Sequence, residues 1–233
     1  MCARSESDVN RICTELNEEF PSRVFGAACD VSSDSGRDIL IAAVEKTFQG
    51  SLHGLVNNVG VNIRAPIGEQ TASQYRTMMS TNVDSVYFLC KMLEGCLRKG
   101  AVECTSGSAV VNISSLAGLF SSGTGACYGM TKAAIIQFTK SLSCEWAKYN
   151  IRVNSVAPWM TMTPMLEEAV KNNPTSLDKV KQWTPNQRLS TAEEAADPAV
   201  FLLMKASSYI TGQCLAVDGG LSAQGFDGPC VSP

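Results

Sequence analysis

The sequence predicts an α/β fold, in which a doubly wound parallel sheet is covered by helices on both faces. Short apolar segments typical of strands alternate with longer segments of helical spacing along the chain, and this alternation builds parallel sheets covered by helices. The strand-like segments stay apolar until they end in polar or turn residues. The chain has 233 residues, of which 45% are apolar, and we expect residues 1–233 to form one domain with a buried core.

Residue patterns place the individual elements. Apolar segments predict strands at residues 23–31, 53–60, 107–115, 151–158 and 212–220. Segments of helical spacing predict helices at residues 5–20, 36–48, 71–99, 125–149 and 191–205. Three of these helices begin with a capping signal, given by Ser5 with Asp8, Thr71 with Gln74, and Thr191 with Glu194. The segment from Trp159 to about Arg188 is rich in Met and Pro and predicts no regular element.

An apolar stripe runs along the first predicted helix. Its members fall at helical spacing and comprise Val9, Ile12, Cys13, Leu16 and Phe20. Because exposing such a stripe to water is unfavourable, we expect a sheet or another helix to cover it.

Composition and charge exclude several classes of function. The formal net charge is −3, so no basic surface indicates binding to nucleic acid or acidic lipid. No apolar run approaches the ~20 residues of a membrane span. Ten cysteines occur without a signal-peptide pattern, a C-x-x-C pair or zinc-type Cys/His spacing. We therefore expect reduced, mostly buried thiols in a cytoplasmic protein, and no metal site.

Polar and turn residues gather where the predicted strands end. They are Asp30, Asn57, Asn58, Ser114, Ser115 and Pro158. Ligands of open parallel sheets bind beyond the carboxyl ends of the strands. The sequence therefore predicts a ligand site at this edge of the sheet, although Asn57 is expected to tie neighbouring strands together rather than to touch the ligand.

Tyr128 and Lys132 carry the predicted chemistry. They are four residues apart on a predicted helix and therefore share one face. A phenol has a pKa near ~10 and is a poor acid or base at neutral pH, but an ammonium within ~4–6 Å is expected to lower that pKa. Such a pair could move a proton to or from an alcohol or carbonyl oxygen.

Two further side chains suit the same site. Ser115 lies at a strand end thirteen residues before Tyr128, where its hydroxyl could hydrogen-bond the same substrate oxygen. Asn82 lies inside a predicted helix, where an amide is a poor helix former. It could hold a backbone kink or a water molecule.

In combination, these motifs resemble the short-chain dehydrogenase/reductase family. The matching segments are NNVG (57–60), Asn82, NISS (112–115), YGMTK (128–132), IRVNSVAP (151–158) and ITGQCLAVDGG (210–220). They occur in the family's order and spacing across nearly the whole chain. CARS, CEWAKYNIRVNSVAPW and the ending VDGGLSAQGF are most similar to the tropinone-reductase-like branch. The resemblance implies a Rossmann-like fold and NADP(H)-dependent interconversion of a ketone and a secondary alcohol.

The resemblance also implies catalytic roles for single residues. Tyr128 would be the acid/base, and Lys132 would lower its pKa and bind the nicotinamide ribose. Ser115 would orient and polarise the carbonyl. Asn82 would position a water molecule that links Lys132 to solvent.

The adenosine half of the cofactor would meet a second group of residues. Asn58 and Gly60 would lie along the adenosine side. Asp30 and Val31 would flank the adenine, although Asp30 could instead merely cap a helix.

Three further residues would bind other parts of the cofactor. Thr161 and Thr163 would contact the nicotinamide amide and the phosphates. Arg4 falls where family members that prefer NADP place a base against the 2′-phosphate, a planar contact that suits a guanidinium. The alternative is that Arg4 is an ordinary surface charge at a helix start.

The segment that would shape the substrate pocket allows two interpretations. Met160, Met162 and Met165 are either core residues or the lining of an adaptable pocket, because thioethers fit varied apolar shapes. Trp159 and Trp183 suit either a wall for a hydrophobic ketone or buried packing.

One family motif does not occur in this sequence. Family members open with a strand, a loop of the type T-G-x-x-x-G-I-G and a helix, which together hold the pyrophosphate. We therefore expect an N-terminally truncated fold, lacking the first βα and most of the second strand, from an incomplete sequence or from a product that has lost cofactor binding. Because the family's first strand is central, we expect strand 23–30 to lack a partner on one side and strand 53–57 to expose its edge.

Two functions therefore compete. The first is an NADP(H)-dependent oxidoreductase that acts on a small carbonyl or alcohol substrate. The second is a non-catalytic relative that serves as an oligomerisation or regulatory scaffold because the phosphate-binding loop is absent. Helices 71–99 and 125–149 resemble those with which the family builds oligomers, so we expect a homodimer or homotetramer without nucleic-acid or membrane partners.

Overall fold

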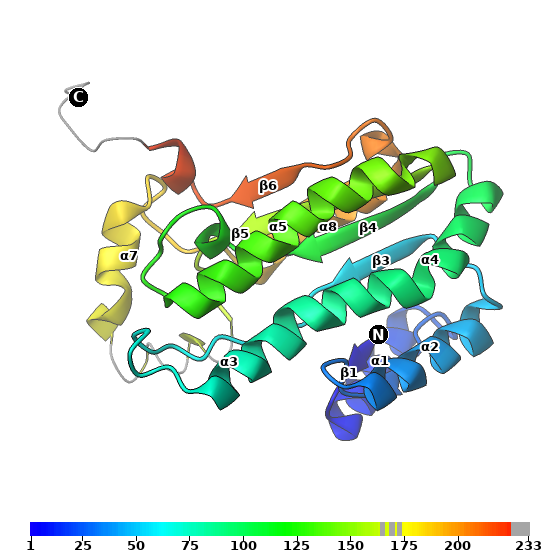
Figure 1. Cartoon of the computed structure of the whole chain (residues 1–233), viewed down its shortest axis with the longest axis horizontal. Helices are drawn as coiled ribbons and strands as arrows, with labels where there is room; N and C mark the ends of the chain where they lie inside the picture. The colour runs from blue at the N-terminus through cyan, green and yellow to red at the C-terminus, as the bar shows by residue number, and fades with distance from the viewer. Residues whose placement is uncertain (164–165, 168–170, 172–173, 225–233) are drawn as a thin grey trace.

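The parallel sheet of the protein is divided into two parts (Figure 1). The computed structural model describes residues 1–163, 166–167, 171 and 174–224. One part pairs β1 (Cys2–Ala3) with β2 (Ala27–Ala28). The other part contains, in spatial order, β3 (Gly54–Asn57), β4 (Ser108–Ile113), β5 (Ile151–Pro158) and β6 (Cys214–Val217). Every pairing is parallel, which confirms the predicted fold class.

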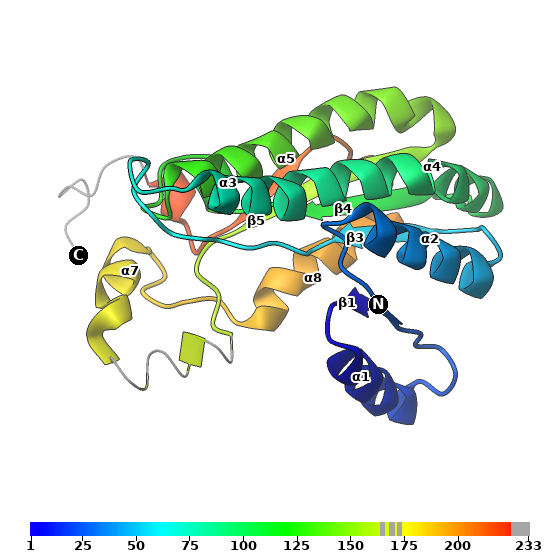
Figure 2. The same cartoon turned by 60° about the horizontal axis from the view of Figure 1, so that its bottom comes forward.

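Helices cover both faces of the four-stranded part (Figure 2). One face carries α3 (Ala72–Met79), α4 (Ser85–Glu103) and α5 (Ala126–Trp146), and the other carries α8 (Ala192–Leu203). The remaining helices are α1 (Glu6–Glu19), α2 (Asp34–Phe48) and α7 (Asp178–Trp183). None of the helices in the described ranges is long and apolar enough to cross a membrane.

The three predicted capping signals form as expected. The hydroxyl of Ser5 accepts a hydrogen bond from the backbone N–H of Asp8. Full capping boxes, with hydrogen bonds in both directions, join Thr71 to Gln74 and Thr191 to Glu194. Each bond satisfies a backbone group that a helix start leaves free, so these helices begin where the sequence predicted.

The main core lies between the central strands and the helices α4 and α5. Leu93 and Leu97 of α4 pack with Ile135 of α5 against Val110 and Val153, which are paired across β4 and β5. These five side chains are at most 2% exposed. This packing fixes the carboxyl ends of β4 and β5 relative to α5, which carries the predicted catalytic residues.

A chain of buried amides links the strands to α5. Asn57 donates a hydrogen bond of 2.8 Å from Nδ2 to Oδ1 of Asn112, and Asn112 donates one of 2.9 Å to Oγ1 of Thr139. Asn57 thus ties β3 to β4, as predicted.

The N-terminal part differs from the expectations in two ways. The predicted strand 23–31 is regular over Ala27–Ala28 and pairs with β1, so β1 rather than β2 borders the division of the sheet. The pairing is short because β1 offers two residues. The expectation that another element covers the apolar stripe of α1 is also partly wrong. Val9 is buried, but Leu16 and Phe20 are 40% and 45% exposed.

The outer edge of β3 is free of any other described strand, as predicted. Its Val56 side chain is 44% exposed. The two sheets therefore face each other with unpaired edges on both sides of the division among the described residues.

Candidate functional site

Ser115, Tyr128 and Lys132 come together where β4 ends. Two residues after β4, Ser115 caps a short 3₁₀ turn, Leu116–Gly118, by accepting a hydrogen bond from the N–H of Ala117. Its side chain also lies near enough to the phenol of Tyr128, in the first turn of α5, to lower the pKa of that phenol. The Nζ atom of Lys132, one turn further along, lies 5.8 Å from the centre of the Tyr128 ring.

Lys132 is held in a buried position. It is 3% exposed, and its Nζ donates a hydrogen bond of 2.8 Å to the carbonyl of Ile113 at the end of β4. The carbonyl of Lys132 accepts a hydrogen bond from the hydroxyl of Ser114. Burial disfavours the charged ammonium and lowers the pKa of Lys132 to about 8.

The acidity of Tyr128 differs from the expectation. Burial raises the pKa of Tyr128, and the side chain of Ser115 and the positive charge of Arg64 offset part of that rise. The prediction that Lys132 lowers the pKa below its ordinary value is therefore wrong for the protein alone. The physical reason is that desolvation dominates, while the Lys132 amine is engaged by the carbonyl of Ile113.

Asn82 occupies a turn of π-helix, Ser80–Asp84, between α3 and α4. Its Oδ1 accepts a hydrogen bond of 2.8 Å from the N–H of Val61, and its Nδ2 donates to the carbonyl of Val61 at 2.9 Å and to Oγ1 of Thr131 at 3.0 Å. The π-helical turn interrupts the regular α-helix at Asn82, and the predicted backbone kink stays a prediction. The predicted role in holding a water molecule stays a prediction.

Gly60 and Asn58 follow β3 and are exposed. A Cβ atom at Gly60 would lie 3.3 Å from Nζ of Lys132 and 3.5 Å from Oδ1 of Asn82. The absence of a side chain thus leaves room directly above the Lys132 amine. A close approach of this kind suits a ligand that passes along the backbone.

Arg4 and Asp30 lie together after the ends of β1 and β2. Hydrogen bonds from Ser32 lower the pKa of Asp30, and the charge of Arg4 lowers it further. Asp30 does not cap α2, because the cap is Ser33. Val31 is 3% exposed, so its side chain belongs to the core.

Thr161 and Thr163 follow β5 and are engaged with their own neighbourhood. Oγ1 of Thr161 accepts a hydrogen bond of 2.9 Å from Ser190, and Oγ1 of Thr163 accepts one of 3.3 Å from the N–H of Leu166. Trp159, just before them, donates from its indole to Thr184. Met165 lies outside the described residues.

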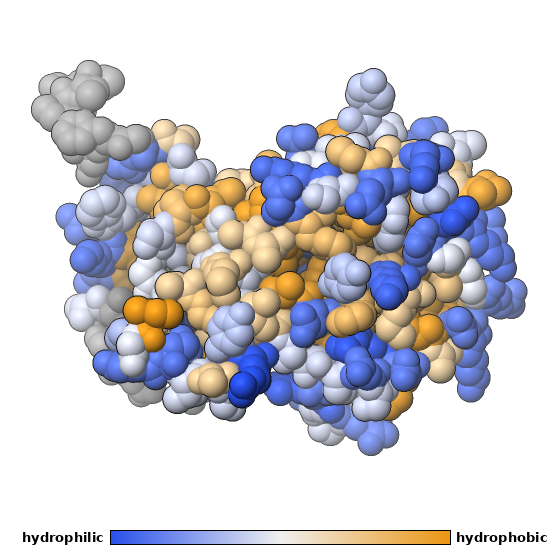
Figure 3. All heavy atoms as spheres, in the orientation of Figure 1, coloured by the Kyte–Doolittle hydropathy of each residue, from blue (hydrophilic) through white to orange (hydrophobic). Residues whose placement is uncertain are grey.

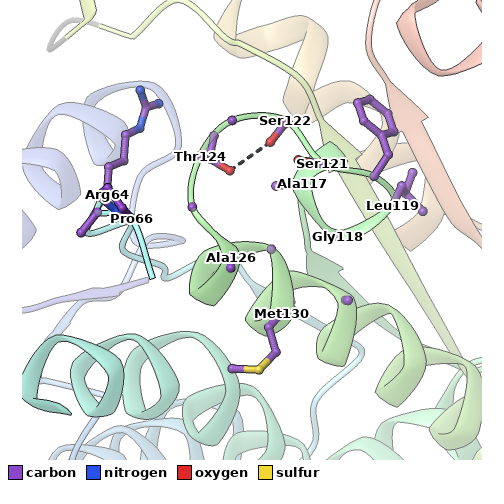
Figure 4. A pocket seen from close by; sticks show the side chains of 16 residues that line it. Arg64, Pro66, Ala117, Gly118, Leu119, Ser121, Ser122, Thr124, Ala126 and Met130 are labelled. Atoms are coloured by element: carbon purple, nitrogen blue, oxygen red, sulfur yellow. Dashed lines mark hydrogen bonds between the residues drawn. The ribbon is translucent and has the colours of Figure 1, made fainter. Parts of the chain in front are cut away.

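A groove of about 800 Å³ lies at the start of α5 (Figure 4), lined by Ala117 and Gly129, which are close in sequence to Ser115 and Tyr128. The loop from Ala117 to Ala126 arches over one side, Met130 of α5 lies below, and Arg64 and Pro66 stand on the opposite side. Apart from Arg64 and a few hydroxyls, its lining is apolar. The lining of the groove therefore suits an apolar molecule.

Sequence reasoning missed Arg64 and Thr131. Arg64 affects the acidity of Tyr128, and Thr131 both hydrogen-bonds Asn82 and donates to the carbonyl of Tyr128. The available signal was position: Arg64 follows the carboxyl end of a predicted strand, and Thr131 lies between Tyr128 and Lys132.

The arrangement is that of an oxidoreductase of the nucleotide-binding α/β class: a phenol, a hydroxyl and an amine gather at the carboxyl edge of a parallel sheet. Comparison with known proteins agrees. Residues 1–222 match the family model described as enoyl-(acyl carrier protein) reductase. The chain belongs to the short-chain dehydrogenase/reductase family.

Individual relatives refine this assignment. A chloroplastic tropinone reductase homolog of Arabidopsis thaliana is 47% identical over 97% of this chain and 68% of its own length. The solved structure of ElxO with NADP bound superposes with a TM-score of 0.86 at 30% identity, covering 96% of this chain and 88% of that one. The structure of a 3-oxoacyl-[acyl-carrier protein] reductase with bound NAD from Brucella melitensis superposes with a TM-score of 0.79 at 34% identity. The match covers 94% of this chain and 79% of that one.

Proposed function

We propose that the protein is an NADP(H)-dependent oxidoreductase that interconverts a ketone and a secondary alcohol, with Tyr128 as acid/base. The observation that carries this proposal is the gathering of the Ser115 hydroxyl, which acts on the acidity of Tyr128, and the buried amine of Lys132 around the Tyr128 phenol. Two hydroxyl groups that meet in this way can both bond one carbonyl oxygen. The names of the tropinone reductase homologs support a ketone substrate.

The residues divide the chemistry among them. When bound, a nicotinamide dinucleotide supplies or accepts the hydride. Ser115 and Tyr128 hold the substrate oxygen, and Tyr128 donates its proton to that oxygen during reduction. Because burial raises the pKa of Tyr128, the phenol is protonated at neutral pH, as a proton donor must be. Lys132 and Asn82 keep the helix and the adjoining backbone in position.

The described residues offer a place for the nicotinamide side of the cofactor. The Gly-rich loop that would hold its phosphates does not occur in this sequence. Gly60 leaves space above Lys132, where the ribose would lie against the amine. Asn58, Asp30 and Val31 are proposed along the adenosine half.

We infer a preference for NADP(H) from Arg4. Its guanidinium stands after β1 beside Asp30, whose carboxylate is already bonded by Ser32, so the positive charge is available to a 2′-phosphate. Thr161 and Thr163 are proposed at the nicotinamide amide and the phosphates. The NADP bound to ElxO supports this choice, whereas the Brucella reductase binds NAD.

Thermal unfolding in the presence of NADPH tests the proposal. A ligand at 100 times its Kd adds about 2.7 kcal/mol of stability, so the melting temperature should rise with NADPH. Arg4→Gln should weaken this rise for NADPH but not for NADH, while Arg11→Gln on α1 serves as the control. If millimolar NADPH leaves the melting temperature unchanged, the non-catalytic scaffold becomes the better description.

We further propose that the protein forms a homodimer or homotetramer through α4 and α5. Apolar side chains gather over the face that carries these helices (Figure 3), and Tyr87 and Met130 are each 47% exposed there. Exposed apolar patches of this kind mark association surfaces. Light scattering should show that Met130→Glu reduces the assembly, whereas Val200→Glu on α8 does not.

A cytoplasmic setting is the last part of the proposal. All nine cysteines among the described residues are free, which suits a reducing compartment. Because one relative is named as chloroplastic, a fluorescent fusion of the full natural protein should be compared with a chloroplast marker.

A further inference from the structure

Arg64 supplies the charge of the groove at the start of α5. Among the described residues that line this groove, no other side chain carries a formal charge. The guanidinium of Arg64 is exposed, and within the described part of the chain it forms neither an ion pair nor a hydrogen bond. Its positive charge is therefore available to a molecule that enters the groove.

One end of the groove lies close to the proposed reaction centre. Ala117 lines this end, and its backbone N–H donates a hydrogen bond of 3.2 Å to Oγ of Ser115. The carbonyl of Ala117 lies 2.9 Å from the place that a Cβ atom would take on Gly129, the residue after Tyr128. The turn that carries Ala117 thus joins the groove to the Ser115 hydroxyl and to the first turn of α5.

The segment that carries Arg64 packs against the same end of α5. Gly125, the N-cap of this helix, has a φ of 99°, and a Cβ atom there would lie 3.4 Å from the carbonyl of Ala65. Arg64 is therefore held beside the first turn of the helix that carries Tyr128. Its charge lowers the pKa of Tyr128, so the guanidinium and the phenol lie within electrostatic reach of each other.

The opposite side of the groove offers hydroxyl groups and apolar surface. Ser122 and Thr124 hydrogen-bond each other at 2.9 Å on the loop across from Arg64 (Figure 4). The described lining beside them includes the side chains of Leu119 and Phe120. An apolar chain that ends in an anion suits this combination, because the chain covers the apolar surface and the anion meets the guanidinium.

We propose that the substrate is an oxo acid, a ketone with a carboxylate on an apolar chain, whose carboxylate binds Arg64 while its carbonyl oxygen meets Ser115 and Tyr128. This inference rests on the proposed function, which places the carbonyl. A guanidinium binds a carboxylate through two parallel hydrogen bonds. The carboxylate is unchanged by the reaction, in which the ketone carbon gains a hydride and its oxygen gains a proton. A cationic amino ketone is disfavoured, because its charge has the sign of Arg64.

Occupation of Arg64 also suits the proton transfer. A carboxylate beside the guanidinium cancels much of the positive charge that lowers the pKa of Tyr128. The phenol of the substrate complex therefore holds its proton more firmly than the phenol of the free protein. Reduction needs this protonated form, because Tyr128 is the proposed proton donor.

Hexanoate and its neutral analogue hexanamide test the carboxylate site on the full chain without any reaction. Ligand-observed nuclear magnetic resonance titrations should show that hexanoate binds at least about tenfold more tightly than hexanamide. Arg64→Gln should remove this preference, and Arg64→Lys should retain part of it. Arg76→Gln is the matched control, because Arg76 is an exposed arginine of α3 outside the groove lining, and it should bind both ligands like the wild type.

The ionisation of Tyr128 gives a second measurement that needs no turnover. Saturating hexanoate should raise the pKa of Tyr128 in an ultraviolet titration of the phenolate, from which the Tyr128→Phe protein is subtracted. The same addition should leave the phenolate titration of Arg64→Gln unchanged. A shift of equal size in both proteins would overturn the proposal, because the anion would then act from another place.

Reduction of ketones by NADPH tests the substrate class itself. The substrates are straight-chain oxo acids with two, three or four methylene groups between carboxylate and carbonyl, each compared with its methyl ester. At least one acid should exceed its ester by about tenfold or more in kcat/KM, and Arg64→Gln should bring this ratio to about one.

The outcomes separate this inference from the proposed function. Turnover of the esters without a gain for any acid, or equal binding of hexanoate and hexanamide, would overturn the oxo-acid assignment. A loss of the NADPH-induced rise in melting temperature in Arg64→Gln would also overturn it, because Arg64 would then bind the cofactor. If no ketone is reduced but hexanoate binds through Arg64, the proposed function fails and the carboxylate site stands.

Discussion

The side-chain amide of Asn82 pairs with both backbone groups of Val61, accepting from its N–H and donating to its C=O. This is the pattern by which one strand residue bonds the next strand. A single side chain from a π-helical turn thus fixes the backbone directly after Gly60. The segment that borders the Lys132 amine is held by Asn82.

Replacing Asn82 by alanine should therefore destabilise the protein strongly. The change leaves the N–H and C=O of Val61 without these partners, and each unsatisfied buried group costs ~1–3 kcal/mol. We expect Asn82→Ala to lose about 2–4 kcal/mol in urea unfolding. Asn58→Ala, at an exposed position on the same segment, is the stability control and should change the unfolding free energy by less than about 0.5 kcal/mol. Equal effects of the two substitutions would contradict the bridging role.

Tyr128→Phe should abolish turnover while leaving dinucleotide binding nearly intact. The substitution removes the hydroxyl that gives up its proton, but the ring that packs near Lys132 remains. Steady-state assays of NADPH-dependent ketone reduction should show a loss of at least about 100-fold in kcat, with an unchanged NADPH-induced rise in melting temperature. Turnover that survives the substitution would refute the assignment of Tyr128 as acid/base.

Lys132 should make the stability of the protein increase with pH above about pH 8. Burial lowers the pKa of Lys132 from 10.5 to about 8. Between these values the unfolded chain binds a proton that the folded chain does not, so raising the pH favours the folded state.

Urea unfolding of the wild type and of Lys132→Met measures this effect. The difference in unfolding free energy should grow in favour of the wild type, by up to about 1.4 kcal/mol per pH unit. The series should stop near about pH 9.5, because the raised pKa of Tyr128 acts in the opposite direction above its ordinary value of ~10. A difference that is constant across this range would contradict the lowered pKa of Lys132 in the folded state.

Arg64 should hold down the pKa of Tyr128. Arg64→Gln removes a positive charge that lowers this pKa, so the phenol should ionise at higher pH than in the wild type. Ultraviolet titration of the phenolate, with the matching Tyr128→Phe protein subtracted, reports the change without substrate. Arg64→Lys should retain much of the effect, and added salt should reduce it because Arg64 is exposed.

The elements of this fold were predictable where a local signal exists. The capping-box patterns at Thr71 and Thr191 predicted the N-cap residues of two helices correctly, because a cap depends on neighbours within one turn. The run 151–158 became β5 over Ile151–Pro158, because proline ends the strand. The length of β2 was not predictable from its own residues, since it depends on how far β1 extends.

The candidate site was likewise predictable only in part from the sequence. The spacing of Tyr128 and Lys132 fixed their shared face. The pKa values of both residues depend on burial, and that of Tyr128 depends also on Arg64, which lies in a loop distant in sequence. Desolvation is a property of the packed molecule and has no signature in a spacing pattern.

The division of the sheet also sets how the molecule should open. β1, α1 and β2 share no strand pairing with the four-stranded part, and the nearby core cluster around Cys29, Val31 and Leu89 is small. Amide protons of Cys2 to Ala28 should therefore exchange with deuterated solvent through a low-energy local release, while those of β4 and β5 wait for global unfolding. Among the described strands, a protease under native conditions should therefore cut near β1 and β2 before β4 and β5.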